Sequence, residues 1–144
     1  MLNRKDSNVG TEITASGESG ASGTTLDAGC IFCLIIDGKI PATVVRDTER
    51  ALAFRDINPQ APTHVLVIPK THAYANAVEI AAGDPALAAE LLREAGEVAA
   101  AEGLAEDGYR LVFNTGDHAG QTVYHVHLHV LGGDALGHFG VPAE

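Results

Sequence analysis

Residues 123–131 constrain this chain more than any other stretch, because their sequence, VYHVHLHVL, places a histidine at every second position. Successive side chains of a β-strand point to opposite faces of the sheet. His125, His127 and His129 would therefore share one face, with neighbouring residues of the row roughly 6 to 7 Å apart. Val126 and Leu128 would pack behind them. A helix would scatter the three imidazoles around its surface, so we predict a strand.

Three adjacent imidazoles suit a purely structural role poorly. They repel one another when protonated and fill core volume with polar groups when neutral. Two functional interpretations remain open at this point. A His-x-His pair on a strand can chelate a divalent metal ion. Alternatively, one neutral imidazole can act as a nucleophile while its neighbours orient it and stabilise charge.

The segment that leads into the histidine run, residues 114–122, favours the second interpretation. Its glycines allow backbone amides to approach an anion, and Gln121 and Thr122 add hydrogen-bond donors beside the imidazoles. Donors directed at a phosphoryl group suit a reaction at phosphorus, where stabilising charge is the main task. Hairpin turns also need glycine, so this segment supports the interpretation only in combination with the three histidines.

The remaining pattern predicts an α+β fold, an antiparallel sheet of about five strands with one main helix packed on a face. The strands are expected over residues 43–46, 51–55, 64–69, 109–114 and 123–131. The helix should begin after Asp84, a good N-cap, with Pro85 at its first position, and end before Gly103. Its spacing assigns one stripe to the core and another to water: Leu87, Leu91, Ala95 and Val98 inside, and Glu90, Arg93, Glu94 and Glu97 outside.

Charge and composition exclude several classes of function. The net charge of −10 repels a phosphate backbone and argues against nucleic-acid binding, although backbone amides can still hold one nucleotide. The longest apolar run, near residue 35, is too short to span a membrane, and no secretory signal is visible. We therefore expect a cytoplasmic protein. Residues 1–28, rich in Gly, Ser and Thr, are expected to form a flexible tail, and residues 29–144 one domain.

Cys30 and Cys33 are the only cysteines and form a Cys-x-x-Cys pair. One interpretation is a buried apolar pair, since Ile31 and Phe32 stand between them. A redox pair would normally open a helix in a thioredoxin-like βαβ pattern, which is not evident here. A structural zinc site needs two further ligands, for which His72 is a candidate because it follows a predicted strand and has no other evident task.

These motifs together resemble the histidine triad (HIT) family. Residues 125–131 match its signature, in which three histidines alternate with apolar residues. Residues 120–124 and the Gly132-Gly133 pair resemble its Hint branch, the purine nucleoside phosphoramidases, as do residues 54–64 and the run into Lys70. The resemblance covers about residues 30–133. It implies the HIT-like α+β fold and a homodimer joined across the main helix and the strand at Tyr109.

The resemblance also implies a reaction and its residues. His127 would attack the α-phosphorus of a nucleoside monophosphate derivative and form a nucleotidyl-histidine intermediate that water hydrolyses. His129 would sit by the non-bridging oxygens, His125 and His64 would support the nucleophile, and Thr122 would donate to the leaving group. The purine nucleotide would be bound through its ribose, base and phosphate by Asp56, Ile31, Phe32, Phe54, Ile57, Asn114, Gly120, Gln121 and Val123.

Relatives with this Cys-x-x-Cys pair complete a tetrahedral zinc site with two histidines. By that resemblance the zinc ligands would be Cys30, Cys33, His72 and His125, and the reaction itself would need no cofactor. The chain departs from the Hint pattern in having no tryptophan for the C-terminal tail that reaches the partner's site. Phe139 is the one aromatic residue available there, and the departure leaves the leaving-group preference open.

Other functions compete with a phosphoramidase. The enzymatic alternatives are hydrolysis of dinucleoside polyphosphates and nucleotidyl transfer, over which the Gln-Thr-Val-Tyr lead-in favours the Hint branch. From other classes, the chain could be a nucleotide-binding regulatory module with incidental turnover, or a protein that binds metal through the triad itself.

Overall fold

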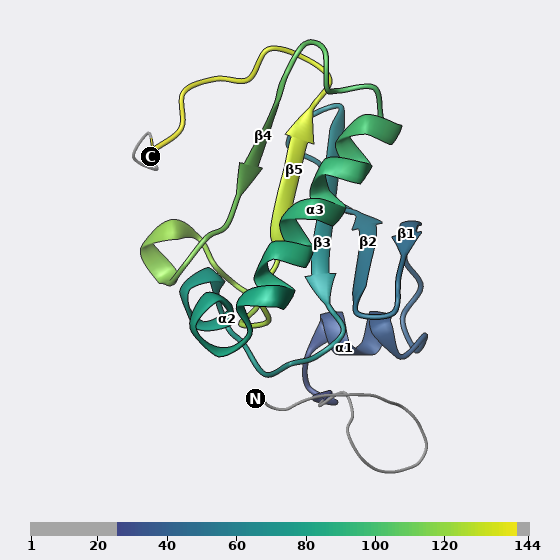
Figure 1. Cartoon of the computed structure of the whole chain (residues 1–144), viewed down its shortest axis with the longest axis vertical. Coiled ribbons are helices and arrows are strands. Elements are labelled where there is room, and N and C mark those ends of the chain that lie inside the picture. The colour runs from purple at the N-terminus through teal and green to yellow at the C-terminus, as the bar shows by residue number, and fades with distance from the viewer. Residues whose placement is uncertain (1–25, 141–144) are drawn as a thin grey trace.

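The computed structural model describes residues 26–140, which form a five-stranded antiparallel sheet with three helices (Figure 1). The strand order is β1-β2-β3-β5-β4, and each neighbouring pair is antiparallel. This confirms the predicted fold class. The elements in chain order are α1 Ile31–Ile36, β1 Val44–Asp47, β2 Ala51–Arg55, β3 Thr63–Pro69, α2 Ala77–Gly83, α3 Pro85–Ala101, β4 Tyr109–Val112, the 3₁₀ turn η1 Asp117–Ala119 and β5 Leu128–Gly132.

Helix α3 covers one face of the sheet and packs across β2, β3 and β5 (Figure 1). Its N-terminus is capped as predicted, because the Asp84 carboxylate accepts a hydrogen bond of 3.0 Å from the Leu87 amide. Gly103, with φ of 76°, follows its end. The predicted apolar stripe is buried and meets alternate residues of the three strands: Ala51, Ala53, Val65, Val67, Leu128 and Val130.

The opposite face of the sheet carries the site. Here the intervening residues of the same strands pack against α1 in a second core cluster: Leu52, Phe54, Leu66, Ile68, Phe32, Cys30 and Cys33. His64 and His129 belong to this side, because each stands one position from a residue in the core beneath α3. The sheet therefore separates an apolar, helix-covered face from a face on which polar chemistry can be exposed.

Three details differ from the sequence prediction. Glu94 was expected to face water but is 5% exposed, because it forms an ion pair with Arg46 of β1. Helices α1 and α2 were not predicted, although Asn76 caps α2 by accepting from the Glu79 amide. Strand β4 ends at Val112 rather than Asn114. Each difference depends on a neighbour or a short cap that the apolar periodicity does not report.

The histidine strand is also shorter than predicted. Strand β5 begins at Leu128, so only His129 of the triad lies in the hydrogen-bonded ladder. Val126 instead donates its amide to the carbonyl of Tyr74, at 3.0 Å, which ties the preceding segment to the loop after β3. Residues 134–140 contain no helix or strand. Most of the predicted N-terminal tail, residues 1–25, lies outside the described residues, and no helix of residues 26–140 is long and apolar enough to cross a membrane.

Candidate active site

The central histidine of the triad is held in one tautomer by the backbone. Its Nδ1 lies 2.9 Å from the carbonyl oxygen of His125. A carbonyl can only accept, so Nδ1 carries the proton and donates. In the neutral imidazole the other nitrogen, Nε2 of His127, then has a free lone pair. The arrangement leaves a nucleophilic atom that the chain's own backbone defines.

A relay of two hydrogen bonds, from the Gln60 amide through His64, sets the tautomer of His129. The Gln60 amide donates to Nδ1 of His64 at 3.0 Å, so the proton of His64 is on Nε2. That nitrogen lies 2.9 Å from Nδ1 of His129, which must accept and therefore carries its own proton on Nε2. The two neighbouring rings of His127 and His129, with centroids 5.1 Å apart, thus present opposite chemistry. His127 offers a lone pair on Nε2, and His129 offers a proton on Nε2.

Burial keeps these imidazoles neutral. Loss of solvation is the largest cause of lowered pKa at His64, His125, His127 and His129. At His125 and His129 neighbouring imidazoles also lower the pKa, a backbone hydrogen bond to Pro69 opposes the shift at His125 and Asp56 opposes it at His129, and the resulting pKa of each is about 4. A neutral triad is the state in which a lone pair is available.

Two polar side chains of the predicted site lie beside this relay. The Asp56 carboxylate is 3.5 Å from Nε2 of His64 and also accepts from the Asn58 amide at 2.8 Å. The side-chain amide nitrogen of Asn114 lies 3.4 Å from Nε2 of His129; since that Nε2 carries a proton, the amide must turn its oxygen towards the ring to accept from it. Asp56 directly follows β2 and Asn114 follows β4, so the ends of these two strands bring both residues to the imidazole row.

The four apolar residues predicted for the base pocket divide into two pairs. Phe32 and Phe54 are buried and stack edge to face, and the Phe32 ring also meets those of His125 and His127, with centroids 5.8 and 5.0 Å away. Ile31 is 45% exposed and Ile57 is 95% exposed. The two phenylalanines thus form a buried apolar surface beside the imidazoles, and the two isoleucines are exposed and accessible to a ligand.

The turn before the triad is built around Gln121, which is buried. Its amide oxygen accepts from the Gly116 amide at 2.9 Å, and its amide nitrogen donates to the carbonyls of Ala75 and Val123. Gly120, in the left-handed region with φ of 83°, and Thr122 are exposed, and Val123 is half-buried. Within residues 26–140 the backbone amides of Thr122 and Val123 make no hydrogen bond, so they are available to an oxyanion.

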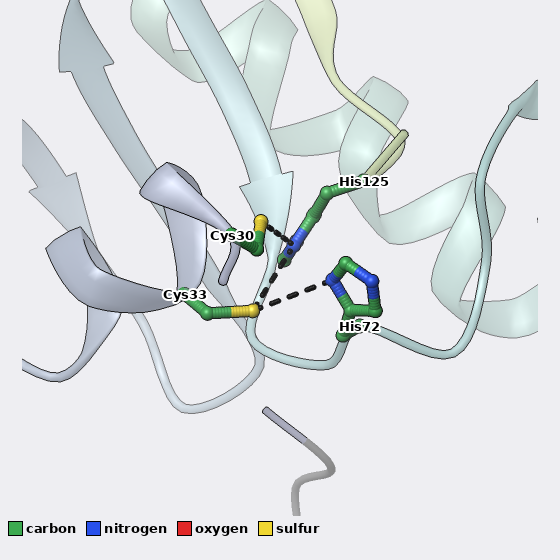
Figure 2. A group of neighbouring side chains, drawn as sticks. All are labelled: Cys30, Cys33, His72 and His125. Atoms are coloured by element: carbon green, nitrogen blue, oxygen red, sulfur yellow. Dashed lines mark hydrogen bonds between the residues drawn. The ribbon is translucent and has the colours of Figure 1, made fainter. Parts of the chain in front are cut away.

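A cluster of two cysteines and two histidines adjoins the triad (Figure 2). Cys30 precedes α1, Cys33 lies within it, His72 follows β3, and His125 begins the triad. Nδ1 of His125 is 3.6 Å from each sulfur, and Nδ1 of His72 is 3.4 Å from the sulfur of Cys33. All four donor atoms lie within 4.8 Å of one another. The structure thus brings together the four residues that the resemblance implied.

The cluster fits a tetrahedral zinc ion in both chemistry and spacing. Zinc–sulfur bonds of about 2.3 Å and zinc–nitrogen bonds of about 2.0 Å would place sulfur and nitrogen about 3.5 Å apart. The ring of His125 is oriented for this, because its Nε2 donates to the carbonyl of Pro69 at 2.9 Å and leaves Nδ1 free. Without a cation, burial raises the pKa of the Cys33 thiol to about 11.

Comparison with known proteins identifies the family. The profile of the HIT domain matches residues 37–136. The chain belongs to the HIT domain family. It is 45% identical over 107 residues to the purine nucleoside phosphoramidase of Escherichia coli K12, an alignment covering 74% of this chain and 89% of that protein. It is 49% identical over 108 residues to a 14 kDa zinc-binding protein of Zea mays, covering 74% and 84%.

A solved HIT structure agrees with this assignment. The HIT family hydrolase of Legionella pneumophila Philadelphia 1 has a TM-score of 0.71 and 54% identity, and the match covers 75% of this chain and 96% of that one. The expected family and its antiparallel fold are therefore confirmed.

Several groups that shape this HIT site were not predicted from the sequence. The carbonyls of Pro69, Ala75 and His125 are backbone groups, for which no side-chain signal exists. The Asp27 carboxylate, 3.8 Å from Nε2 of His72, stands on the far side of that ring from the sulfurs. A carboxylate three residues before a Cys-x-x-Cys pair was a usable signal for it. His118 and His138 are exposed.

Replacing His129 tests the neutral relay through the pH dependence of stability. Its pKa is about 4 in the folded chain and about 6.5 when unfolded, so the unfolded state binds more protons between these values. Its contribution should be complete above about pH 6.5 and be lost as the pH falls towards 4.

We expect the unfolding free energy of His129→Gln, measured by urea titration, to fall less steeply from pH 7 to pH 5 than that of wild type. His138→Gln, which changes an exposed histidine, is the control and should keep the wild-type slope. Equal slopes for wild type and His129→Gln would contradict a neutral, buried His129.

Proposed function

We propose that this HIT-domain protein is a hydrolase that cleaves nucleoside 5′-monophosphate derivatives, phosphoramidates above all, through a nucleotidyl-histidine intermediate. The observation that carries the proposal is the pair of opposite tautomers, a lone pair on Nε2 of His127 beside a proton on Nε2 of His129. The names of the relatives support it, since one is a purine nucleoside phosphoramidase and another a HIT family hydrolase.

The first step forms a phosphorus–nitrogen bond. Nε2 of His127 attacks the α-phosphorus, and the bond from phosphorus to the leaving group breaks with its electron pair. Thr122, which is exposed three residues before the triad, would give its hydroxyl proton to the departing amine. The carbonyl of His125 stabilises the positive charge that develops on the attacking ring, because it accepts the Nδ1 proton.

The second step returns the enzyme to its starting state. Water attacks the same phosphorus, the bond to His127 breaks with its electron pair returning to Nε2, and the nucleoside monophosphate leaves. The proton released by the water replaces the one that Thr122 gave to the amine. His129 stabilises the non-bridging oxygens in both steps by donating from Nε2, and His64 keeps that proton in place. The backbone amides of Thr122 and Val123 supply further donors.

The nucleotide's other parts meet residues around the triad. The Asp56 carboxylate is an acceptor for ribose hydroxyls, and the exposed Ile31 and Ile57 provide apolar surface for a purine. Phe32, which packs on Phe54 and on the ring of His127, excludes water from the imidazoles. Asn114, beside Nε2 of His129, completes the phosphate side together with Gly120.

Replacing His127 tests the nucleophile. We expect His127→Ala to lower the turnover of adenosine phosphoramidate by about three orders of magnitude or more, because no other side chain supplies the attacking lone pair. Binding of AMP, measured by calorimetry, should persist.

Radiolabelled nucleotide should remain bound to wild type after rapid denaturation but not to His127→Ala. His138→Ala, at an exposed histidine, is the control and should turn over normally. Wild-type turnover in His127→Ala would show that another group attacks. Preferential cleavage of dinucleoside polyphosphates, or nucleotide binding without turnover, would instead favour the competing functions.

We propose that the Cys30, Cys33, His72 and His125 cluster holds a structural zinc ion, which would link α1 to the triad and take no part in bond breaking. The fit of the four donors supports this, as does the similarity to a zinc-binding protein. The cation would stabilise the thiolate form of Cys33, whose pKa is otherwise raised by burial.

Metal analysis of reduced protein should find about one zinc per chain, the stoichiometry of a single tetrahedral site. Cys33→Ser should lose the metal, while His138→Ser should retain it. Chelation should lower the melting temperature more than it lowers kcat measured well below that temperature. Freshly purified, reduced protein without zinc would contradict the proposal.

We also propose a homodimer formed along β4. This strand is one edge of the sheet in residues 26–140, so its outer backbone groups are unpaired by other strands. Leu111 is in register with Val130, which lies in the core beneath α3, so Tyr109 and Leu111 extend that apolar face beyond the helix. Both side chains are more than a third exposed.

Sedimentation should show wild type with twice the mass of one chain. Leu111→Lys should sediment as a monomer, because it places a charge on the proposed interface. Val44→Lys, at an exposed residue of the opposite edge strand β1, is the matched control and should remain dimeric. A monomeric wild type would exclude this interface.

A further inference from the structure

We propose that Gln121 is a positioning residue that holds the phosphate-binding turn in place from behind, and that its side chain is not a ligand of the phosphate. The inference rests on the proposed function, because the turn matters only if residues 115–123 receive a phosphoryl group. It gives Gln121 a task different from that of the donor expected from the sequence.

The hydrogen bonds of the Gln121 amide leave no donor for a phosphate. The oxygen accepts from the Gly116 amide at 2.9 Å, and the nitrogen donates at 2.7 Å to Ala75 and at 3.1 Å to Val123. One partner is an N–H group and two are carbonyls, so the orientation of the amide is determined without ambiguity. Both protons of the amide nitrogen are therefore used inside the protein.

The backbone of Gln121 is occupied as well. Its own amide donates to the carbonyl of Gly116 at 3.1 Å, so residues 116 and 121 are joined by two hydrogen bonds in opposite directions. The residue as a whole is only 4% exposed. A polar side chain that is buried and fully paired supports its surroundings instead of contacting a ligand from solvent.

These bonds connect the turn to an anchored loop. Ala75 lies in the loop between β3 and α2, and the preceding Tyr74 accepts the Val126 amide through its carbonyl. The next residue, Asn76, caps α2 through the Glu79 amide. The loop is thus fixed to a helix on one side and to the triad segment on the other. Gln121 joins the turn to this fixed loop through its hydrogen bonds to Gly116 and Ala75.

The turn needs such support because little else holds it. Asp117, His118, Ala119 and Gly120 are all exposed. Gly116 and Gly120 both adopt positive φ, at 84° and 83°, which suits a tight turn but gives it no side-chain contacts. Among residues 26–140, one other side chain is hydrogen-bonded to the turn: the Tyr124 hydroxyl donates to Asp117 at 2.6 Å, in an exposed position where the bond contributes little.

Removing the amide should therefore weaken phosphate binding more than chemistry. Gln121→Met keeps the side-chain length but leaves one N–H and two carbonyls without their partner, and the turn can shift to rehydrate them. Such a shift affects the bound substrate and the transition state alike, which raises KM and leaves kcat nearly unchanged. The nucleophile, held by the carbonyl of His125, should stay in position.

The test compares Gln121→Met and Gln121→Glu with wild type in the full-length protein. We expect the Kd for AMP and the KM for adenosine phosphoramidate to rise about tenfold, equivalent to one lost hydrogen bond. The value of kcat should stay within about threefold. Gln121→Glu should behave alike, because a carboxylate can accept from Gly116 but cannot donate to the two carbonyls. Tyr124→Phe, which removes the exposed tie of the same turn, should leave both constants within about twofold.

The outcomes separate this inference from the proposed function. Wild type that binds no AMP would refute the function. Wild type that binds AMP, with Gln121→Met binding it equally well, would overturn the inference alone, as would a lower melting temperature at constant KM. A fall in kcat at constant KM would overturn it too, because Gln121 would then act in the chemistry. Should either variant fail to fold, hydrogen exchange of wild type decides. The Gly116 amide should exchange slowly, and fast exchange would contradict the proposed support of the turn by the Gln121 side chain.

Discussion

The hydrogen bond from Nδ1 of His127 to the carbonyl of His125 is the interaction on which the rest of this structure depends. His125 serves three groups at once: its Nδ1 faces the two cysteine sulfurs, its Nε2 donates to Pro69, and its carbonyl sets the tautomer of His127. The proposed zinc and the proposed nucleophile therefore share one residue. A shift of α1 would move Cys33 and His125, and the carbonyl of His125 would then change the orientation of His127, the proposed nucleophile.

Burial gives this arrangement its chemistry. The imidazoles lie between a sheet whose far face is sealed by α3 and a wall formed by Phe32 and α1. Water is too scarce there to stabilise an imidazolium, so the pKa of each histidine falls and the lone pairs remain free. The groups that orient the imidazoles are mostly backbone carbonyls and amides, which cost no side-chain entropy to position.

The sequence predicted most of the fold because its patterns are local. Helix α3 followed from its cap, its apolar stripe and its terminal glycine, and four strands followed from short apolar runs between turn residues. Where it was wrong, long-range contacts decided. Glu94 is buried because Arg46 of a distant strand meets it, and β5 starts late because the segment before it binds the loop at Tyr74. Periodicity reports neither contact.

Alternation alone determined that three histidines share one face, and the family motifs indicated which side chains would gather around them, the two cysteines and His72 included. Only the tertiary structure decided what each group does. Which nitrogen of a histidine donates and which accepts depends on the backbone group that lies opposite, as at Pro69 and Gln60. The orientation of the Gln121 amide depends in the same way on the carbonyl of Ala75. Every residue carries the same backbone groups, so a sequence does not distinguish them. Their roles arise only when the folded chain brings them within hydrogen-bonding distance of a side chain.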